Sequence, residues 1–184
     1  MLTTILAMGL LAGWVAFEFI FRRPGDAASL AGSSNDRLST PLLVIGYACA
    51  GLLPFLIGTW STPSWGIAWL GILAGAIGLV VRASGMRALG GAYTRNLRTT
   101  EAQSLITTGP YRYVRHPGYL GSILVWVGAS LAFGGWPVAA AVVTILGIAY
   151  AWRITSEEAM LRARFGEQWR AYTASTARLI PGIW

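Results

Sequence analysis

Five apolar stretches form the pattern of this sequence, separated by two long polar segments and two short turns. Long apolar runs with few charges are typical of helices that cross a membrane, because about 20 such residues span the hydrocarbon core. We therefore expect helices over residues 2–21, 41–60, 65–81, 119–133 and 138–152. The last two are short for a span, and only the turn Gly134–Pro137 separates them, so they should form a helical hairpin.

Small residues mark one face of the third stretch. Gly71, Gly75 and Gly78 recur at steps of four and three residues. Small residues at such spacing let two membrane helices approach closely. We expect this face to contact a neighbouring helix.

Composition agrees with the membrane interpretation and also predicts an orientation. The chain is 55% hydrophobic and only 11% charged, whereas a soluble domain carries about 25% charged residues. All arginines fall in residues 22–40, 82–117 and 153–184, and the intervening turns have none. Basic segments stay on the cytoplasmic side of a membrane. The prediction is an all-α integral membrane protein with five transmembrane helices, the N-terminus outside and the C-terminus cytoplasmic.

One structural domain is enough for this length, with two parts of different character. Residues 1–81 form an N-terminal three-helix membrane part, and residues 82–184 hold a polar loop, the hairpin and a C-terminal helix. That last helix is expected to be amphipathic, since Leu161, Phe165, Trp169 and Tyr172 recur at three- and four-residue steps among charged residues. It should lie on the cytoplasmic membrane surface or on the bundle.

A dense polar and aromatic run, Ser104 to Gly121, precedes the fourth stretch. Pro117 suits the first turn of the helix that follows, where its missing N–H costs nothing. The free N–H groups of that turn attract an anion or an acceptor-rich ligand. Taken alone, the run is explained equally well as a membrane-surface anchor, because Tyr and Arg commonly flank membrane helices.

A second polar cluster, Arg153, Glu157 and Glu158, follows the fifth stretch. Arg153 and Glu157 are four residues apart and share a helix face. The hairpin brings the two clusters together, so His116, Tyr119, Arg153 and Glu157 can converge at the cytoplasmic membrane face. The alternative is an exposed ion pair between Arg153 and Glu157, worth roughly 0.3–0.5 kcal/mol.

Composition argues against several function classes. The net charge of +7 follows the membrane topology and does not indicate nucleic-acid binding. With one His and one Cys, no internal disulfide forms and metal binding is improbable. Cys49 lies in an apolar stretch and is expected to be a small buried hydrophobe.

Two motifs carry a family resemblance. GPYRYVRHPGYLG, followed about forty residues later by EEAMLRARFGEQWRAY and then RLIP, resembles the isoprenylcysteine carboxyl methyltransferase family. These membrane enzymes are related to the phospholipid methyltransferases. The matching region runs from Asn96 to Pro181, and a five-helix architecture fits small members of the family.

The resemblance implies an S-adenosylmethionine site at the cytoplasmic membrane face. The residues that it assigns to the cofactor are Asn96, Gln103, Ser104, Leu105, Ile106, Tyr111, His116, Pro117, Gly118, Tyr119 and Glu157. Arg153 matches the arginine that family members use on the substrate. Asn96 and Gln103 stand where the family commonly has Gln and His.

The implied reaction is methylation of the carboxylate of a lipophilic, isoprenylcysteine-like substrate. Two kinds of partner fit this reaction, a lipophilic small molecule and a lipidated protein, each in contact with membrane lipids. A carboxylate is ionised at pH 7, so no general base is needed. A phospholipid or amine N-methyltransferase would share the motifs but needs a base. An NADPH-dependent sterol-type reductase, with a similar RHP and FG-x-x-W pattern, and a non-catalytic membrane protein are further alternatives. The Arg-only, Ala- and Gly-rich composition favours a prokaryotic plasma membrane.

Overall fold

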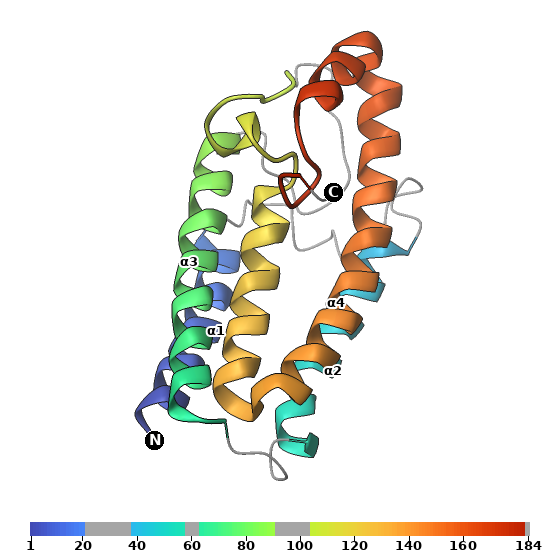
Figure 1. Ribbon diagram of the computed structural model, residues 1–184. Coiled ribbons are helices and arrows are strands. Elements are labelled where there is room, and N and C mark those ends of the chain that lie inside the picture. Colours follow the sequence, from blue (N-terminus) through green and yellow to red (C-terminus); the bar gives the residue numbers. More distant parts are fainter. Residues whose placement is uncertain (21–37, 58–62, 91–103, 183–184) are drawn as a thin grey trace.

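The protein is a bundle of long helices. The computed structural model describes residues 1–20, 38–57, 63–90 and 104–182. Its elements are α1 (Leu2–Ile20), α2 (Ser39–Ile57), α3 (Trp65–Leu89), the 3-10 helix η3 (Gly109–Arg112) and α4 (Pro117–Ser175). Figure 1 shows α1, α3 and the two long limbs of α4 side by side, with α2 against the second limb.

Two glycines divide α4 into three parts. Gly135 (φ 66°) and Gly166 (φ 50°) adopt positive φ angles inside the helix, a conformation that glycine enters without steric cost. The parts are called the first arm (117–134), the second arm (136–165) and the terminal helix (167–175). Gly135 reverses the chain, so the two arms run antiparallel (Figure 1). The predicted hairpin is confirmed, whereas the single amphipathic helix expected after residue 152 is broken at Gly166.

Glycines let α3 and the first arm touch backbone to backbone. A Cβ atom added to Gly71 would lie 2.4 Å from the carbonyl oxygen of Gly128. A Cβ on Gly78 would lie 2.7 Å from the carbonyl oxygen of Gly121, and no side chain fits at such distances. The expected close contact of the glycine face of α3 is therefore confirmed, with the first arm as its partner.

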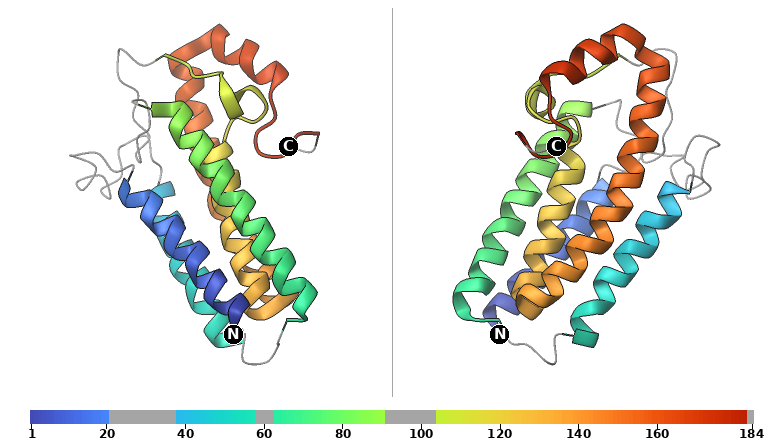
Figure 2. Two further views of the ribbon diagram at one scale, coloured as in Figure 1. Left: turned by 90° about the vertical axis from the view of Figure 1, so that its left-hand side faces the viewer. Right: turned by 45° about the vertical axis from the view of Figure 1, so that its right-hand side comes forward.

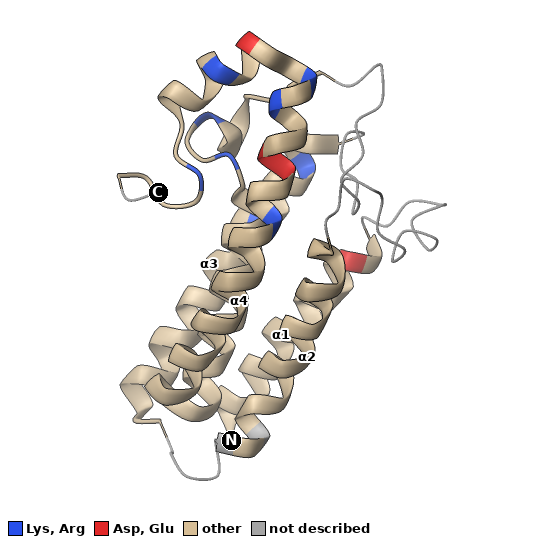
Figure 3. Ribbon diagram, turned by 90° about the vertical axis from the view of Figure 1, so that its right-hand side faces the viewer, with Lys and Arg blue, Asp and Glu red and all other residues tan. Residues whose placement is uncertain are grey.

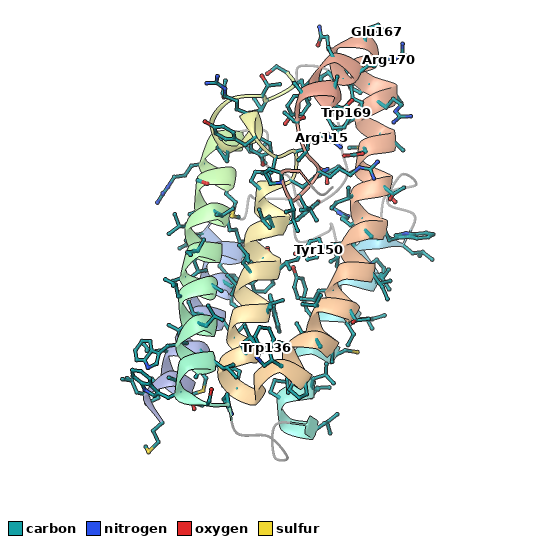
Figure 4. All side chains as sticks on the ribbon, in the orientation of Figure 1. Arg115, Trp136, Tyr150, Glu167, Trp169 and Arg170 are labelled. Carbon is teal, nitrogen blue, oxygen red and sulfur yellow. The ribbon has the colours of Figure 1, made fainter. Side chains whose placement is uncertain are left out.

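Aromatic side chains fill the middle of the bundle. The ring centroids of Trp14 and Tyr47 are 4.7 Å apart, and those of Tyr47 and Trp126 are 5.1 Å apart. Tyr150 of the second arm lies within this core, at mid-height in Figure 4. Cys49, by contrast, lies on the exposed face of α2, so its predicted burial is wrong. An apolar run in a membrane helix is compatible with contact with lipid as well as with burial.

Charged residues do not end the helices where the hydrophobic pattern predicted. α3 continues past Val81 to Leu89, so the expected boundary between residues 81 and 82 falls inside a helix. The second arm likewise continues past Trp152 to Phe165. In both cases the first charged side chain, Arg82 or Arg153, is buried against polar partners and the helix runs on.

The distribution of charge along the bundle is that of a membrane protein. α1, α3 and α4 are each long and apolar enough to cross a membrane, and residues Ser39–Pro54 of α2 form a shorter apolar helix. Figure 3 shows the charged residues gathered at one end of the bundle, away from the start of α1. Large exposed hydrophobic side chains such as Leu73, Ile77 and Ile148 cover the rest of the surface. These findings support an integral membrane protein.

Candidate active site

The two polar clusters predicted from the sequence meet where the arms of α4 reach the charged end. The hydroxyl of Tyr119, on the first arm, donates a hydrogen bond of 2.6 Å to Oε2 of Glu157 on the second arm. The same hydroxyl accepts a hydrogen bond of 3.2 Å from Nε of Arg153. Tyr119 therefore links the guanidinium and the carboxylate, and the three residues are called the central triad.

His116, at the start of α4, packs against the central triad. It is the N-cap residue of α4, is buried, and its ring stacks on that of Tyr119 at a centroid distance of 5.4 Å and an interplanar angle of 4°. Its Nδ1 lies 3.8 Å from Oε2 of Glu157. Pro117 follows in the first turn, as predicted. The four residues expected to converge do so.

Glu158, the next residue of the second arm, accepts hydrogen bonds from two arginines and also lies beside His116. Nε of Arg115 and Nε of Arg178 each donate to its carboxylate at 2.9 Å, and Nε2 of His116 lies 3.4 Å away. Burial alone would raise the pKa of the Glu158 carboxyl, but hydrogen bonds from His116 and Arg115 outweigh it and lower the pKa to about 2. Glu158 is thus an ionised anchor at neutral pH. Sequence analysis placed it in the cluster but gave it no role.

The segment after the terminal helix folds back onto the loop before α4 (Figure 2). Residues 176–182, called the terminal segment, pair with that loop through a parallel bridge between Val114 and Ala177. The backbone N–H of Arg115 donates to the carbonyl of Ala177 at 2.8 Å, and that of His116 donates to the carbonyl of Arg178 at 3.1 Å. The terminal segment therefore fixes the backbone of His116 itself.

The terminal helix is held against η3. The hydroxyl of Tyr172 donates to the carbonyl of Tyr111 at 2.7 Å. Trp169, buried beside Tyr172, faces inward, whereas Glu167 and Arg170 project outward at the tip of the molecule in Figure 4. Two aromatic residues of the predicted amphipathic pattern, Trp169 and Tyr172, thus pack on the protein itself.

Arg153 also ties the second arm to the start of α2. Its side chain is only 4% exposed, and its Nη1 donates to Oγ of Ser39 at 3.0 Å and to Oγ1 of Thr40 at 2.9 Å. The sequence gave no signal for these two partners, because they lie more than 110 residues from Arg153 in the chain. The interpretation of Arg153 as half of an exposed ion pair is wrong, since the side chain is buried.

Comparisons with known proteins decide the family. Residues 67–168 match the family model of phospholipid methyltransferases. The chain is 30% identical to a probable protein-S-isoprenylcysteine O-methyltransferase of Oryza sativa subsp. indica, over 92% of this chain and 87% of that protein. It is 29% identical to protein-S-isoprenylcysteine O-methyltransferase A of Arabidopsis thaliana, over 85% of this chain and 84% of the relative. The chain belongs to the isoprenylcysteine carboxyl methyltransferase family.

A solved structure extends the comparison to the fold. The structure of a eukaryotic intramembrane Ras methyltransferase, an isoprenylcysteine carboxyl methyltransferase, superimposes with a TM-score of 0.66 at 21% identity. The match covers 78% of this chain and 53% of the solved chain, so the protein spans about half the length of that enzyme. The shared fold is that of a membrane methyltransferase.

Family membership places the protein among the methyltransferases. It does not support the two alternative interpretations, a sterol-type reductase and a non-catalytic membrane protein. The relatives named here come from eukaryotes, and they lend no support to the prokaryotic source that the composition favoured. Within the described residues no group of three or more His, Cys, Asp or Glu could hold a metal ion.

The cofactor residues assigned by the family resemblance lie in three places. Asn96 and Gln103 fall outside the described residues. Ser104, which is exposed, and the half-buried Leu105 and Ile106 precede η3, and Tyr111 is buried within it. The remaining residues lie at the start of α4 and in the central triad: His116, Pro117, Gly118, Tyr119 and Glu157. The structure therefore brings the second half of the assigned set together around Tyr119.

Proposed function

We propose that this methyltransferase transfers a methyl group from S-adenosylmethionine to the carboxylate of a lipophilic, isoprenylcysteine-like acceptor at the cytoplasmic face of the membrane. The observation that carries the proposal is the central triad, in which Tyr119 joins a partly exposed carboxylate to a buried guanidinium. One group suits a cationic cofactor, and the other suits an anionic acceptor.

The chemistry around Glu157 fits the cofactor. Its side chain is 25% exposed, and its Oε1 has no hydrogen-bond partner among the described residues. The hydroxyl of Tyr119 contacts the Glu157 carboxylate, and the ring of Tyr150 packs on that of Tyr119, with centroids 5.0 Å apart. A carboxylate and aromatic faces attract cations such as an ammonium or a sulfonium, and the carboxylate also accepts hydrogen bonds from hydroxyls. Glu157, Tyr119 and His116 would hold S-adenosylmethionine, together with Tyr111 and the Ser104–Ile106 segment.

When bound, S-adenosylmethionine supplies an electrophilic methyl group on a sulfonium. Arg153 of this chain supplies a guanidinium, a group that binds carboxylates by charge-assisted hydrogen bonds. An acceptor carboxylate there would take the place of hydrogen bonds that Arg153 makes to Tyr119, Ser39 or Thr40. Because such an acceptor is already ionised at neutral pH, the chain's residues need only bind and orient it. Holding two reactants in line can contribute roughly 7–11 kcal/mol to a reaction. An O-methyltransferase therefore needs no base beyond the residues described.

The site lies at the charged end of an apolar bundle (Figure 3). The positive-inside rule assigns that end to the cytoplasm. An acceptor with an apolar tail would keep the tail in lipid and present its carboxylate to Arg153. Five transmembrane helices, counting the two arms of α4 separately, are part of the same proposal.

The test is methyl transfer by the purified protein in lipid nanodiscs. S-adenosylmethionine with a radiolabelled methyl would be supplied with N-acetyl-S-farnesylcysteine, with its carboxamide, or with phosphatidylethanolamine. We expect label only in the free acid, in a product that releases volatile methanol under alkali, as an ester does. Base-stable label in phosphatidylethanolamine would instead establish the N-methyltransferase. No label in any acceptor, with no binding of S-adenosylhomocysteine, would refute the proposal.

Variants separate the two halves of the site. Glu157→Gln should lose affinity for S-adenosylhomocysteine, while Glu167→Gln, an exposed glutamate of the terminal helix, should not. Arg153→Lys should lower kcat/KM for the acceptor about tenfold, because Lys lacks the planar fork and one charge-assisted hydrogen bond. Cofactor affinity should stay close to wild type in Arg153→Lys; loss of both properties would assign Arg153 to the cofactor or to folding.

A further inference from the structure

A buried ion pair lies in the bundle beside the central triad and takes no part in it. Arg82 of α3 forms an ion pair with Glu18 of α1, and their side chains are only 7% and 15% exposed. Nη1 of Arg82 donates to Oγ of Ser122 at 2.5 Å and to the carbonyl oxygen of Gly118 at 3.0 Å. The guanidinium also lies over the ring of Trp14, 5.5 Å from its centroid. One side chain thus joins α1, α3 and the first arm.

Burying a charged side chain at this position costs free energy, which suggests that Arg82 has a role besides stability. Arginine within a membrane bundle is costly unless it is paired, and apolar residues could replace a buried ion pair at little or no cost in stability. The glycine contacts already hold α3 against the first arm without any charge. The contact between α3 and the first arm therefore does not depend on Arg82.

The contacts of Arg82 end on the turn that carries the candidate site. The carbonyl of Gly118 accepts from Arg82 and, at 3.1 Å, from Oγ of Ser122. Ser122 in turn accepts a hydrogen bond of 3.0 Å from Nε1 of Trp14. Gly118 lies between His116 and Tyr119, so these bonds fix the backbone between the two stacked rings.

Packing from α3 leaves this turn little freedom. A Cβ added to Gly85, one turn after Arg82, would meet Cγ of Pro117 and the backbone nitrogen of Gly118, both at 3.2 Å. The turn from Pro117 to Tyr119 is thus enclosed by backbone packing from Gly85 and by directed hydrogen bonds from Arg82. Packing limits how closely the turn approaches α3, whereas the hydrogen bond from Arg82 is directional and favours one orientation of the Gly118 carbonyl.

We propose that Arg82, held by Glu18, is a positioning residue that sets the first turn of α4 and thereby the places of His116 and Tyr119. Arg82 does not touch the ligands. It acts through the Gly118 carbonyl and Ser122. The consequence for cofactor binding rests on the proposed function; the consequence for the turn itself does not.

Arg82→Lys is the informative variant. Lys keeps the positive charge for Glu18, but one ammonium cannot reach the carboxylate, the hydroxyl and the carbonyl with the geometry of a guanidinium fork. We expect affinity for S-adenosylhomocysteine to fall about tenfold, the loss of one charge-assisted hydrogen bond. The KM for S-adenosylmethionine should rise, while the KM for the acceptor, which Arg153 sets, should stay unchanged. Arg87→Lys, an exposed arginine on the same helix, is the matched control.

Hydrogen exchange tests the turn without any ligand. In Arg82→Lys the amides of residues 118–122 should exchange faster than in wild type, with exchange in the second arm unchanged. Ser122→Ala keeps the ion pair and should give a smaller change in the same direction, and it carries the test if Arg82→Lys fails to fold.

The outcomes separate the two proposals. Wild-type exchange and wild-type cofactor affinity in Arg82→Lys, or in Ser122→Ala if that variant is used, would overturn the positioning role. Faster exchange in a protein whose wild type binds no S-adenosylhomocysteine would support the positioning of the turn and refute the proposed function alone.

Discussion

Tyr119 is the residue on which the candidate site depends. Its hydroxyl is both the donor to Glu157 and an acceptor for Arg153, and its ring stacks on His116. A hydroxyl can fill both roles at once, which neither Phe nor Leu can do. The ring and the hydroxyl therefore have separable functions.

Tyr119→Phe isolates the hydroxyl. The ring and its stacking on His116 remain, but the link between Arg153 and Glu157 is lost, so affinity for S-adenosylhomocysteine should fall about tenfold. Calorimetry on the detergent-solubilised protein measures this change. Tyr113→Phe, at a tyrosine that is 67% exposed, is the control and should bind normally. Equal affinity in both variants would show that the hydroxyl does not support the cofactor site.

Residue-level features differ in how far the sequence revealed them. The convergence of His116, Tyr119, Arg153 and Glu157 was predictable, because helical spacing and a short turn fix which residues meet. The partners of Arg82 and Arg153 were not predictable from spacing. Glu18 lies 64 residues from Arg82, and Ser39 lies 114 residues from Arg153. No periodicity connects positions on separate helices.

At the scale of elements, the terminal segment is held by an ion pair that responds to pH. The pKa of Glu158 is about 2 in the folded protein and 4.5 as the reference for an unfolded chain. A depressed folded pKa stabilises the fold above the unfolded value, and this stabilisation disappears as pH falls from about 4.5 to about 2.

The terminal segment should therefore detach under acid. We expect limited proteolysis near residue 177 by an acid-active protease to increase as pH falls from 4.5 towards 2. Glu158→Gln should show such cleavage already at higher pH and lose the pH dependence. Glu167→Gln, at a side chain 82% exposed, should behave as wild type. Cleavage that is independent of pH in the wild type would contradict the role given to Glu158.

The close contact between α3 and the first arm can be tested by adding a methyl group at a glycine. Gly128→Ala places a Cβ atom 2.4 Å from the carbonyl oxygen of Gly71, so backbone must move. We expect a loss of about 1–3 kcal/mol in stability, as for other overpacked sites. Gly147→Ala, in the second arm with nothing within 4 Å of the added atom, should be neutral or stabilising. Thermal unfolding in detergent would compare the two variants, and equal melting temperatures would contradict the close contact.

For the molecule as a whole, hydrophobic pattern and charge predicted the helical membrane class and the order of the helices. They predicted the residues at which the helices end less well. The pattern found the hairpin at Gly135 and the glycine face of α3. It placed helix ends at the first charge, at Val81 and Trp152, because it treated every charge as exposed. Arg82 and Arg153 are buried with partners, so the helices continue.

Orientation in the membrane remains a prediction at this scale. The turn at Gly135 and the terminal helix lie at opposite ends of the bundle (Figure 1). In a Cys49→Ser background, single cysteines at Trp136 and Arg170 should react with a membrane-impermeant maleimide from opposite sides of intact vesicles. Labelling of both from one side would refute the five-helix topology.

The hairpin formed at Gly135 keeps the central triad within one stretch of the chain. Both halves of the central triad, Tyr119 on one arm and the Arg153–Glu157 pair on the other, belong to a single continuous helix–turn–helix. The family match of residues 67–168 covers α3 and the hairpin but neither α1 nor α2. The family signature thus falls on one compact unit of the chain. Arg82 and Arg153 of that unit take partners from α1 and α2, through Glu18, Ser39 and Thr40, so a change in the first two helices that removes these contacts would also disturb the unit.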